Sequence, residues 1–374
     1  MLKRLLFCLL LPLFLNCFTM AEKSVVDRAA ELKRPHHREI VRIPDIPGYR
    51  TLKCDFHIHT VFSDGVVWPA VRVREAWEEG LDAIAITDHI ENQPSKAFIG
   101  GDHNSSYEVA RPEADQMNMI LIRAGEITRS MPPGHLNALF LSDVNKLDVE
   151  DPEAAVDAAL EQGAFVFWNH PGWEAQQPDD TIMFPIHERW IKEKKIHGME
   201  VFNEKEWYPQ VLKWVLDNDL AVIGNSDIHD VNEHFYDLVD GHRPMTLVFA
   251  GELTEPSIRE ALFAGRTAAW WNNEIAGKTE YLEALFRQSV EVKKAHFVDE
   301  EGMASFRICN CSDLTFIFET MDESLDFGRV TLLPDGEQIV RMELKDNQLT
   351  IPLKAVNFHT GMGENLAVEI TFSK

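Results

Sequence analysis

The sequence contains little cysteine and little positive charge for its length. Its 374 residues include five cysteines, and 36 lysines and arginines stand against 61 aspartates and glutamates, so the formal net charge is −25. Such an acidic surface repels polyanions at long range, and binding to long nucleic acids depends on Lys and Arg side chains at the phosphates. Stable binding to long nucleic acids is therefore not expected.

Long apolar runs are also missing. The longest lies at residues 5–15, which is shorter than the roughly 20 residues that a transmembrane helix needs. Lys3 and Arg4 precede it, and Thr19-Met20-Ala21 supplies small residues before a cleavage point. This order is typical of a secretory signal peptide, here residues 1–21. We therefore expect an exported protein, periplasmic or extracellular, with no transmembrane helix in the mature chain.

Cleavage after Ala21 would leave three cysteines, namely Cys54, Cys309 and Cys311. Cys309 and Cys311 would share one face of a strand, which is a poor geometry for bonding each other. No disulfide scaffold is therefore expected, although an exported protein would permit one. A lipid anchor at Cys17 is the alternative to simple cleavage, but Asn16 before it is a poor match to the small residue that such sites favour.

Residues 22–49 are polar and interrupted by prolines, which predicts an extended lead-in. From residue 50 to residue 276, short apolar runs alternate with amphipathic segments. The runs, expected to be strands, are 52–56, 83–87, 119–124, 136–141, 164–168, 198–202, 220–224 and 245–250. The segments expected to be helices are 69–79, 152–162, 187–194, 208–217 and 255–264. This alternation favours a parallel sheet buried on both faces, and the number of units favours a closed α/β barrel over an open sheet.

Residues 277–374 follow a different pattern. A helix-like segment at 280–287 precedes apolar segments at nearly regular spacing, separated by turn signals such as Asp335-Gly336 and Asp346-Asn347. The pattern predicts a small all-β sandwich domain. None of its residues suggests chemistry, so we expect a packing module, or one that faces a glycan or a protein partner.

The first strong chemical signal is a pair of histidines, His57 and His59, at the end of the first apolar run. In a strand, positions i and i+2 point the same way, so both imidazoles face one point in space. Similar arrangements recur at Thr87-Asp88-His89 and at Asn225-Ser226-Asp227-Ile228-His229, each after another apolar run. The recurrence indicates that imidazoles and carboxylates gather at the ends of several strands.

Nine residues of this kind occur near strand ends in the first domain. They are His57, His59, Asp64, His89, Glu126, His135, His170, Asp227 and His229. In a parallel barrel the carboxyl ends of all strands share one rim, where active sites form. Imidazole and carboxylate together suit Zn, Mn or Fe, and so many donors exceed the needs of one tetrahedral ion. We therefore predict a multinuclear metal site, although each residue taken singly is also compatible with a helix cap, a turn or a solvated surface.

These motifs resemble those of the PHP (polymerase and histidinol phosphatase) superfamily of metal-dependent phosphoesterases. The matching segments are Asp55-x-His57-x-His59-Thr60-x-x-Ser63-Asp64-Gly65, Ile86-Thr87-Asp88-His89, Gly125-Glu126-Ile127, Asn169-His170-Pro171-Gly172 and Ser226-Asp227-x-His229. The resemblance covers roughly residues 50–270. It implies a distorted (β/α)7 TIM-like barrel at residues 50–276 that holds two to three divalent metal ions.

By position, the resemblance implies three groups of metal ligands. The first ion would be held by His57, His59, Glu126 and Asp227, the second by Glu126, His135 and His170, and the third by Asp64, His89 and His229. His135 is the least defined of these, because its spacing after Glu126 varies within the family. Glu126, His170, Asp227 and His229 would carry catalysis through the metal cluster.

The function implied is that of an exported metal-dependent phosphoesterase. Cations a few Å apart lower the pKa of a bridging water, which supplies a hydroxide nucleophile near neutral pH, and they hold phosphoryl oxygens. A positive cluster within so acidic a chain favours small phosphomonoesters or short phosphodiesters, nucleotide-like or sugar-phosphate-like, over long polyanions.

Side chains that would grip the substrate directly are less clearly marked. Arg111, Lys205 and Arg266 are predicted to do so, and Arg123, Arg243 and His103 are further candidates; an ordinary surface ion pair is the alternative for the cationic ones. Residues 90–112 interrupt the alternation directly after His89 and are expected to form a lid or specificity loop. Trp173 and Trp207 also follow strands, where they would stack on a base or sugar, or pack in the core.

Two other functions stay open at this stage. An amidohydrolase-like enzyme that cuts C–N or C–O bonds would share the His-x-His pair and a late aspartate, but Lys205 is the only lysine near a position suited to bridging two metals. The second alternative is a non-catalytic glycan- or partner-binding protein with a vestigial barrel. The full set of ligand-type residues argues against it.

Overall fold

The computed structural model describes residues 37–300, 302–322, 327–343 and 348–373. The predicted signal peptide and residues 22–36 of the predicted lead-in lie outside these ranges. Residues 38–49 form no helix and no long strand, yet Ile43 and Ile46 are buried in the hydrophobic core. This end of the predicted lead-in is therefore part of the folded structure.

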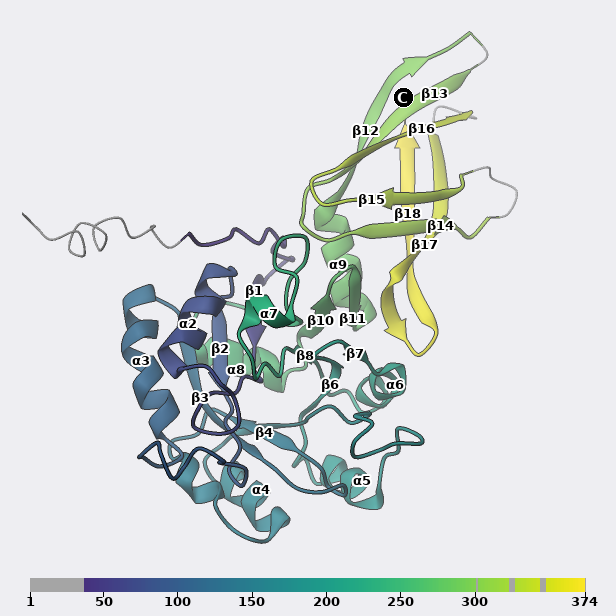
Figure 1. Cartoon of the computed structure of the whole chain (residues 1–374). Helices are drawn as coiled ribbons and strands as arrows, with labels where there is room; N and C mark the ends of the chain where they lie inside the picture. The colour runs from purple at the N-terminus through teal and green to yellow at the C-terminus, as the bar shows by residue number, and fades with distance from the viewer. Residues whose placement is uncertain (1–36, 301, 323–326, 344–347, 374) are drawn as a thin grey trace, which may run out of the picture. The chain divides into compact units, whose positions relative to one another are not determined.

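Each apolar run predicted to be a strand overlaps one (Figure 1). These strands are β1 (Arg50–Asp55), β2 (Ala83–Ile86), β3 (Ile120–Ile127), β4 (Leu136–Leu139), β5 (Phe165–Trp168), β6 (Gly198–Asn203), β8 (Ala221–Asn225) and β9 (Met245–Ala250). The structure adds β7 (Glu206–Trp207), β10 (Thr267–Trp271) and β11 (Glu274–Gly277). They belong to one sheet in the order β11-β10-β9-β1-β2-β3-β4-β5-β6-β7, with β8 paired to β6.

The sheet is mixed, so the expectation of a parallel sheet holds for only part of it. β1, β2 and β3 are parallel, as are β5, β6 and β8. β4 runs antiparallel to both β3 and β5, and β9 runs antiparallel to β1 and β10. Only residues 128–135 join β3 to β4, and a parallel crossover needs about a dozen residues or more. The short connection therefore forces β4 to reverse.

β8, which lies beyond β6 in this order, meets β9, which lies beside β1, through the side chain of Thr246. The Thr246 hydroxyl in β9 donates to the Gly224 carbonyl at 2.8 Å and accepts from the Gly224 amide at 3.0 Å. A Cβ at Gly224 would lie 2.8 Å from the Cβ of Ala269 in β10, so glycine is what allows this close approach. The strands thus close into the distorted barrel that the resemblance implies.

Helices cover the outer side of the strands (Figure 1). They are α2 (Pro69–Glu78), α3 (Ser105–Met117), α4 (Pro152–Leu160), α5 (Pro185–Lys192), α6 (Pro209–Asp217) and α8 (Glu255–Phe263), with the short α7 (Asn232–Phe235) and the 3₁₀ helix η1 (Val144–Leu147). Proline begins four of them, where its missing N–H costs nothing. Asp151 caps α4 by accepting from the Ala154 amide, and Thr254 caps α8 from the Ser257 amide.

The segment predicted to be a lid, residues 90–112, is partly helical. α3 begins at Ser105, so the irregular connection after β2 ends before it. Pro112, which favours irregular backbone, is accommodated inside α3, and Asn118 ends the helix in the left-handed conformation with φ of 53°. The irregular part that follows His89 is therefore shorter than the sequence suggests.

After α9 (Thr279–Ser289), the regular structure among the described residues consists of β-strands. β12 (Val290–Val298), β13 (Met303–Asn310) and β16 (Glu337–Glu343) form a 3-stranded antiparallel sheet. β14 (Phe316–Thr320), β15 (Arg329–Leu332), β17 (Gln348–Gly361) and β18 (Glu364–Ser373) pair in a second layer, whose β17 also bonds to β11. Phe306 of β13 packs edge-on against Phe372 of β18, with ring centroids 5.1 Å apart. The predicted all-β sandwich is confirmed.

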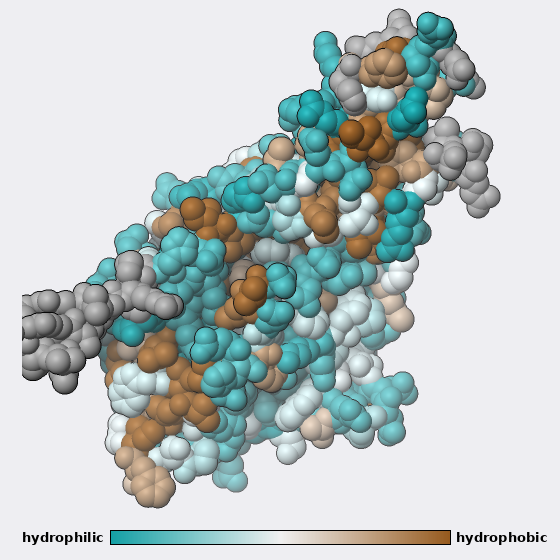
Figure 2. Space-filling view, turned by 45° about the horizontal axis from the view of Figure 1, so that its top comes forward, coloured by the Kyte–Doolittle hydropathy of each residue, from teal (hydrophilic) through white to brown (hydrophobic). Residues whose placement is uncertain are grey.

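The face shown in Figure 2 is mostly hydrophilic, with apolar side chains in scattered patches. This surface agrees with the strongly acidic composition. Within the residues that the structure describes, every helix is too short or too polar to cross a bilayer. Cys54 is buried, and it is a free thiol, as are Cys309 and Cys311.

Candidate metal centre

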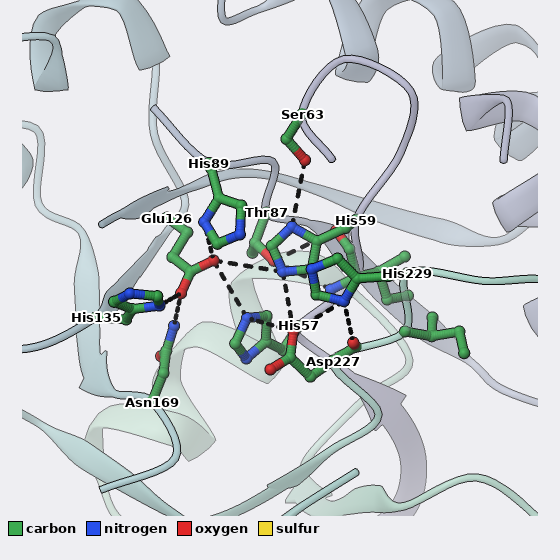
Figure 3. A network of polar contacts seen from close by, with 12 residues as sticks. His57, His59, Ser63, Thr87, His89, Glu126, His135, Asn169, Asp227 and His229 are labelled. Atoms are coloured by element: carbon green, nitrogen blue, oxygen red, sulfur yellow. Dashed lines mark hydrogen bonds and ion pairs between the residues drawn. The ribbon is translucent and has the colours of Figure 1, made fainter. Parts of the chain in front are cut away.

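The nine residues predicted to bind metal come together from six strands and the loops beside them, and most of them appear in Figure 3. His57 and His59 follow β1, Asp64 lies in the next turn, His89 follows β2, Glu126 is in β3, His135 precedes β4, His170 follows β5, and Asp227 and His229 follow β8. His135 reaches the others because β4 is antiparallel, so its start lies beside the ends of β3 and β5. The reversed strand thus explains why a residue before a strand joins residues that follow strands.

Ligand-type atoms of these side chains form four overlapping groups in which all atoms lie within 4.8 Å of one another. The groups are His57, His59 and Asp227; His57, Glu126 and His170; His89, Glu126 and His135; and His59, Asp64, His89 and His229. Because they share members, they form one continuous cluster. These groups differ from the three ligand sets that the family resemblance implies, because His59 also lies beside Asp64 and His89 also lies beside Glu126.

Glu126 lies at the centre of the cluster and is fully buried. Its Oε2 lies 2.7 Å from His89 Nδ1, 3.3 Å from His59 Nε2 and 3.4 Å from His57 Nε2. Its Oε1 lies 2.9 Å from His135 Nδ1. A carboxylate with histidines around both oxygens has the arrangement expected of a ligand shared between metal ions.

Several buried polar atoms of the cluster make no hydrogen bond, although some of them lie at ion-pair distance from another cluster atom. They are His57 Nε2, His59 Nε2, Asp64 Oδ1, Glu126 Oε2, His135 Nδ1 and Asp227 Oδ1. Leaving a buried polar atom unpaired costs about 1–3 kcal/mol. All of these are imidazole or carboxylate atoms, which are the donors that Zn, Mn and Fe prefer. The residues present therefore fit the predicted metal ions.

The central carboxylates are held in the charged form. Burial alone would raise the pKa of Glu126 and of Asp227, but nearby histidines, led by His89 for Glu126 and by His57 for Asp227, hold both pKa values well below the usual range. Two negative charges therefore stand among the imidazoles, which suits the binding of divalent cations.

The imidazoles are less uniform. Burial lowers the pKa of His59 and that of His170 to about 3, so both rings are neutral, which is the form that binds a metal ion. Burial also acts to lower the pKa of His57, but Asp227, Glu200 and Glu126 raise it well above its ordinary value. His89 is affected in the same direction, because against the effect of burial Glu126 and Asp64 raise its pKa to about 10.

Two cluster residues have a backbone conformation that side chains rarely adopt. The φ angle is 29° at His170 and 49° at Asp227. Such positions cost about 1–3 kcal/mol and gather at functional sites. The His170 amide donates to Glu200 at 2.7 Å, and Asn203 Nδ2 donates to the Asp227 carboxylate at 3.2 Å. These hydrogen bonds hold both residues in place.

Glu200 in β6 is a supporting residue that the motifs did not reveal. It is fully buried, and its Oε1 is hydrogen-bonded to His57 Nδ1 at 2.9 Å. Because Nδ1 is engaged, His57 Nε2 faces the cluster, which is how buried carboxylates orient histidine ligands. Its signal in the sequence is a single glutamate inside an otherwise apolar strand, Gly198–Asn203.

Arg72 of α2 joins the two loops that carry most of the cluster. Its side chain is fully buried, and its Nε donates to the His59 carbonyl at 2.9 Å. Its terminal nitrogens donate to the carbonyls of Ile228 at 3.1 Å and Asp230 at 2.7 Å. One guanidinium thus fixes the loop after β1 to the loop after β8.

We expect Arg72→Lys to weaken metal binding about 10- to 100-fold, because an ammonium group cannot reach three carbonyls in this fork geometry. The affinity would be measured by titrating metal-free protein. Arg74→Lys on the same helix, where the side chain pairs with Glu113 near the surface, is the matched control. Equal affinities of the Arg72 variant and the wild type would contradict the role of this arginine.

A cavity of about 500 Å³ opens onto the cluster. Besides cluster residues, its lining comprises Asn92, Thr128, the loop after β5 with Trp173, Ala175 and Gln176, and the β6–β7 hairpin with Asn203, Glu204 and Glu206. Of the described residues, no lysine or arginine lines it. The cavity therefore has room for a small ligand but offers no cationic side chain to it.

The three cations predicted to contact substrate have other partners. Arg111 lies on the exposed side of α3, 3.7 Å from Asp115. Lys205 Nζ lies over the Phe235 ring, 4.1 Å from its centroid. Arg266 donates to Glu260 at 2.9 Å. The structure thus does not bring these side chains to the cavity, because each is engaged elsewhere by an opposite charge or an aromatic face.

Of the further candidates for substrate contact, one lines the cavity and the others have partners elsewhere. Arg123 donates to Asn104 at 2.9 Å, His103 lies 3.5 Å from Asp148, and Arg243 is buried beside Asp55 at 3.1 Å. Trp207 packs against Phe202, with ring centroids 4.6 Å apart. Trp173, in contrast, lines the cavity. It is therefore the aromatic residue in a position to meet a ligand.

The fold and the cluster define an α/β protein with a multi-histidine, carboxylate-rich site and an all-β C-terminal part. A family model described as an Ig-like domain matches residues 290–371. No curated protein matches the chain. A solved two-domain protein from Bacteroides vulgatus ATCC 8482, which contains a predicted PHP-like metal-dependent phosphoesterase, is 40% identical, with a TM-score of 0.87 over 90% of this chain and 100% of that one. This chain therefore belongs to the PHP-like family.

Two more distant structures are also similar in part. A candidate metal-dependent phosphoesterase from Bifidobacterium adolescentis ATCC 15703 is 17% identical, with a TM-score of 0.42 over 57% of this chain and 96% of that one. An amidohydrolase from Chromobacterium violaceum is 14% identical, with a TM-score of 0.37 over 48% of this chain and 88% of that one. At this level of similarity neither bears on the chemistry of the site.

Proposed function

We propose that this protein is an exported, metal-dependent phosphoesterase that hydrolyses phosphomonoesters or short phosphodiesters at a site of two or three divalent metal ions. One observation carries the proposal: unpaired, buried imidazole and carboxylate atoms face one another beside a cavity of about 500 Å³. Membership of the PHP-like family supports the reaction class. The positions of the nine ligand-type side chains and of the residues that orient them support it further.

The proposed ligands fall into the sets that the cluster offers. His57, His59, Glu126 and Asp227 would hold one ion, Glu126, His135 and His170 a second, and Asp64, His89 and His229 a third, with His59 and His89 standing between sets. Bound divalent ions would supply activation of water and neutralisation of phosphoryl charge.

The side chains are oriented for this task. The ring of His57 is fixed through Nδ1 by Glu200, and that of His229 through Nδ1 by the Asp227 carbonyl at 2.7 Å. Each therefore presents Nε2 to the cluster. Asp88 accepts from the Thr60 amide at 2.7 Å and from the Ser63 hydroxyl at 2.7 Å, which braces the turn that carries Asp64. These contacts set ligand positions before any substrate arrives.

Substrate would enter through the cavity with its phosphate toward His89, His135 and Asp227. Since no described lysine or arginine lines the cavity, binding of the phosphate depends on the cluster itself. This dependence favours one small phosphate group over long polyanions, and the acidic surface acts in the same direction.

The signal peptide at residues 1–21, the barrel at residues 50–276 and the C-terminal domain at residues 277–374 are part of the same proposal. Of the two other functions, an amidohydrolase-like enzyme is disfavoured because Lys205, the one lysine that the sequence places near a position suited to bridging two metals, packs on Phe235. A vestigial barrel is disfavoured because all nine ligand-type side chains stand together.

The test is to purify residues 22–374 with Mn²⁺ or Zn²⁺ and to screen phosphomonoesters, nucleotides and phosphodiesters. We expect hydrolysis that falls at least about 100-fold in His57→Ala and in Asp227→Ala, because each removes a proposed ligand. His234→Ala, on the exposed α7, is the control. Elemental analysis counts the ions. Full activity in both ligand variants, or cleavage of amides but of no phosphoester, would refute the proposal.

A further inference from the structure

The cavity beside the cluster has an acidic wall. Glu204 and Glu206 belong to the hairpin between β6 and β7 and line the cavity, whereas no described lysine or arginine does. Trp173, which is 39% exposed, lines the same cavity. The part of a ligand that lies beyond the cluster must therefore suit carboxylates and an aromatic ring.

Glu204 occupies a position that glutamate rarely takes. Asn203 and Glu206 pair across the hairpin, so Glu204 and Lys205 form a two-residue turn, in which the φ angle of Glu204 is 48°. Turns of this kind are normally built from Asn or Gly, because other residues are strained there. The turn geometry therefore does not account for a glutamate at position 204. A role of its carboxylate would account for it.

Among the residues that the structure describes, the carboxylate of Glu204 has no hydrogen-bond or ion-pair partner. The neighbouring Lys205 turns its ammonium group onto Phe235, at 4.1 Å, and Glu206 accepts a hydrogen bond from the Tyr208 hydroxyl. Burial and the Asp227 carboxylate raise the pKa of Glu204 to about 7, and cations bound nearby would favour its charged form. The hairpin therefore presents the carboxylate of Glu204 to the cavity as a hydrogen-bond acceptor.

We infer that Glu204 selects the alcohol half of the substrate, so that the site takes monophosphates of neutral, hydroxyl-bearing molecules such as sugar phosphates and rejects those with a second phosphate. The inference rests on the proposed phosphoesterase function and names its substrate class. A carboxylate accepts hydrogen bonds from hydroxyl groups but repels phosphate oxygens, which are negative and are themselves acceptors.

The remainder of the cavity agrees with this class. Trp173 offers an apolar face to a sugar ring, and a cavity of about 500 Å³ suits one small ligand. Asn203 is engaged with Glu200 and Asp227, and Asn92 with Asp64. Neither amide carries a positive charge that would neutralise a second phosphate, and both are already hydrogen-bonded to carboxylates around the cluster.

The experiment compares kcat and KM for glucose 6-phosphate and glucose 1,6-bisphosphate, with p-nitrophenyl phosphate as a general phosphoester. The metal-loaded wild type is expected to prefer the monophosphate at least about tenfold in kcat/KM. Glu204→Gln should lower this preference about three- to tenfold, mainly through a lower KM for the bisphosphate, since the amide keeps the shape but loses the charge. Glu233→Gln, an exposed residue of α7, is the control of equal charge change.

Three outcomes would overturn the inference. They are a wild type that prefers the bisphosphate, an unchanged preference in Glu204→Gln, and a loss of metal ions from that variant, which would make Glu204 a ligand instead. Absence of activity toward p-nitrophenyl phosphate and every other phosphoester would refute the proposed function as well. If Glu204→Gln hydrolysed p-nitrophenyl phosphate and kept the wild-type preference for the monophosphate, the role of Glu204 would be refuted and the proposed phosphoesterase function would stand.

Discussion

Replacing Glu126 by glutamine is expected to lower phosphoesterase activity more than about 100-fold and to remove at least one metal ion. Both carboxylate oxygens face histidine nitrogens, at 2.7 Å from His89 and 2.9 Å from His135. An amide of the same shape offers one weak acceptor and puts N–H donors where a ligand is needed. Loss at this one position should therefore disturb more than one ion.

The measurement is activity together with metal content of Glu126→Gln by elemental analysis. Glu108→Gln serves as the control, because Glu108 is an exposed residue of α3 that pairs with Arg123. A variant that retains its full metal content and full activity would show that Glu126 is not a ligand. Thermal unfolding with and without metal distinguishes a lost ion from a misfolded chain, since a ligand that binds only the folded state raises its stability.

Replacing Arg243 by methionine is expected to lower the free energy of unfolding by about 3–5 kcal/mol. Arg243 is fully buried and donates to Asp55 at 3.1 Å and to Glu79 at 2.6 Å and 2.8 Å. Without it, the buried Asp55 would have no cation, and Asp55 also accepts from the Ser226 amide at 3.1 Å. The variant would thus leave uncompensated negative charge directly behind the ligand loops.

Chemical denaturation measures this loss, and Arg287→Met provides the comparison. Arg287 pairs with Glu283 on the surface of α9, where an ion pair contributes about 0.5 kcal/mol or less. If both variants lost the same small amount, Arg243 would not hold this part of the barrel together. The same buried ion pairs explain why Arg243 does not bind phosphate.

The predicted ligands could be found from sequence because the chemistry of the site is local to strand ends. A histidine or carboxylate directly after an apolar run, as at His57, His89 and Asp227, is placed by the strand before it. The structure gathers all nine predicted side chains; that they bind metal stays a prediction. The alternation of apolar runs and amphipathic segments was likewise enough to predict an α/β barrel and a separate β sandwich.

What could not be predicted depends on contacts between distant parts of the chain. The direction of β4 follows from the short connection before it, and that connection is short because pairing with β4 extends β3 to Ile127, beyond the apolar run that ends at residue 124. The role of Glu200 could not be predicted, because a single glutamate in an apolar strand looks the same in the sequence whether or not it orients a metal ligand. Arg111, Lys205 and Arg266 illustrate the converse, because a positive charge near a motif does not tell which partner neutralises it.

The site also combines residues from opposite ends of the barrel sequence. The hydrogen bond from Ser226 to Asp55 spans 171 residues, and that from Arg243 to Asp55 spans 188. A growing chain therefore cannot complete the cluster until nearly the whole barrel has been synthesised and its last strands have joined the first. If the chain is exported unfolded, as its N-terminal segment suggests, the metal must be acquired in the compartment where folding finishes. Metal supply in that compartment, and not in the cytoplasm, would then decide which ion the enzyme carries.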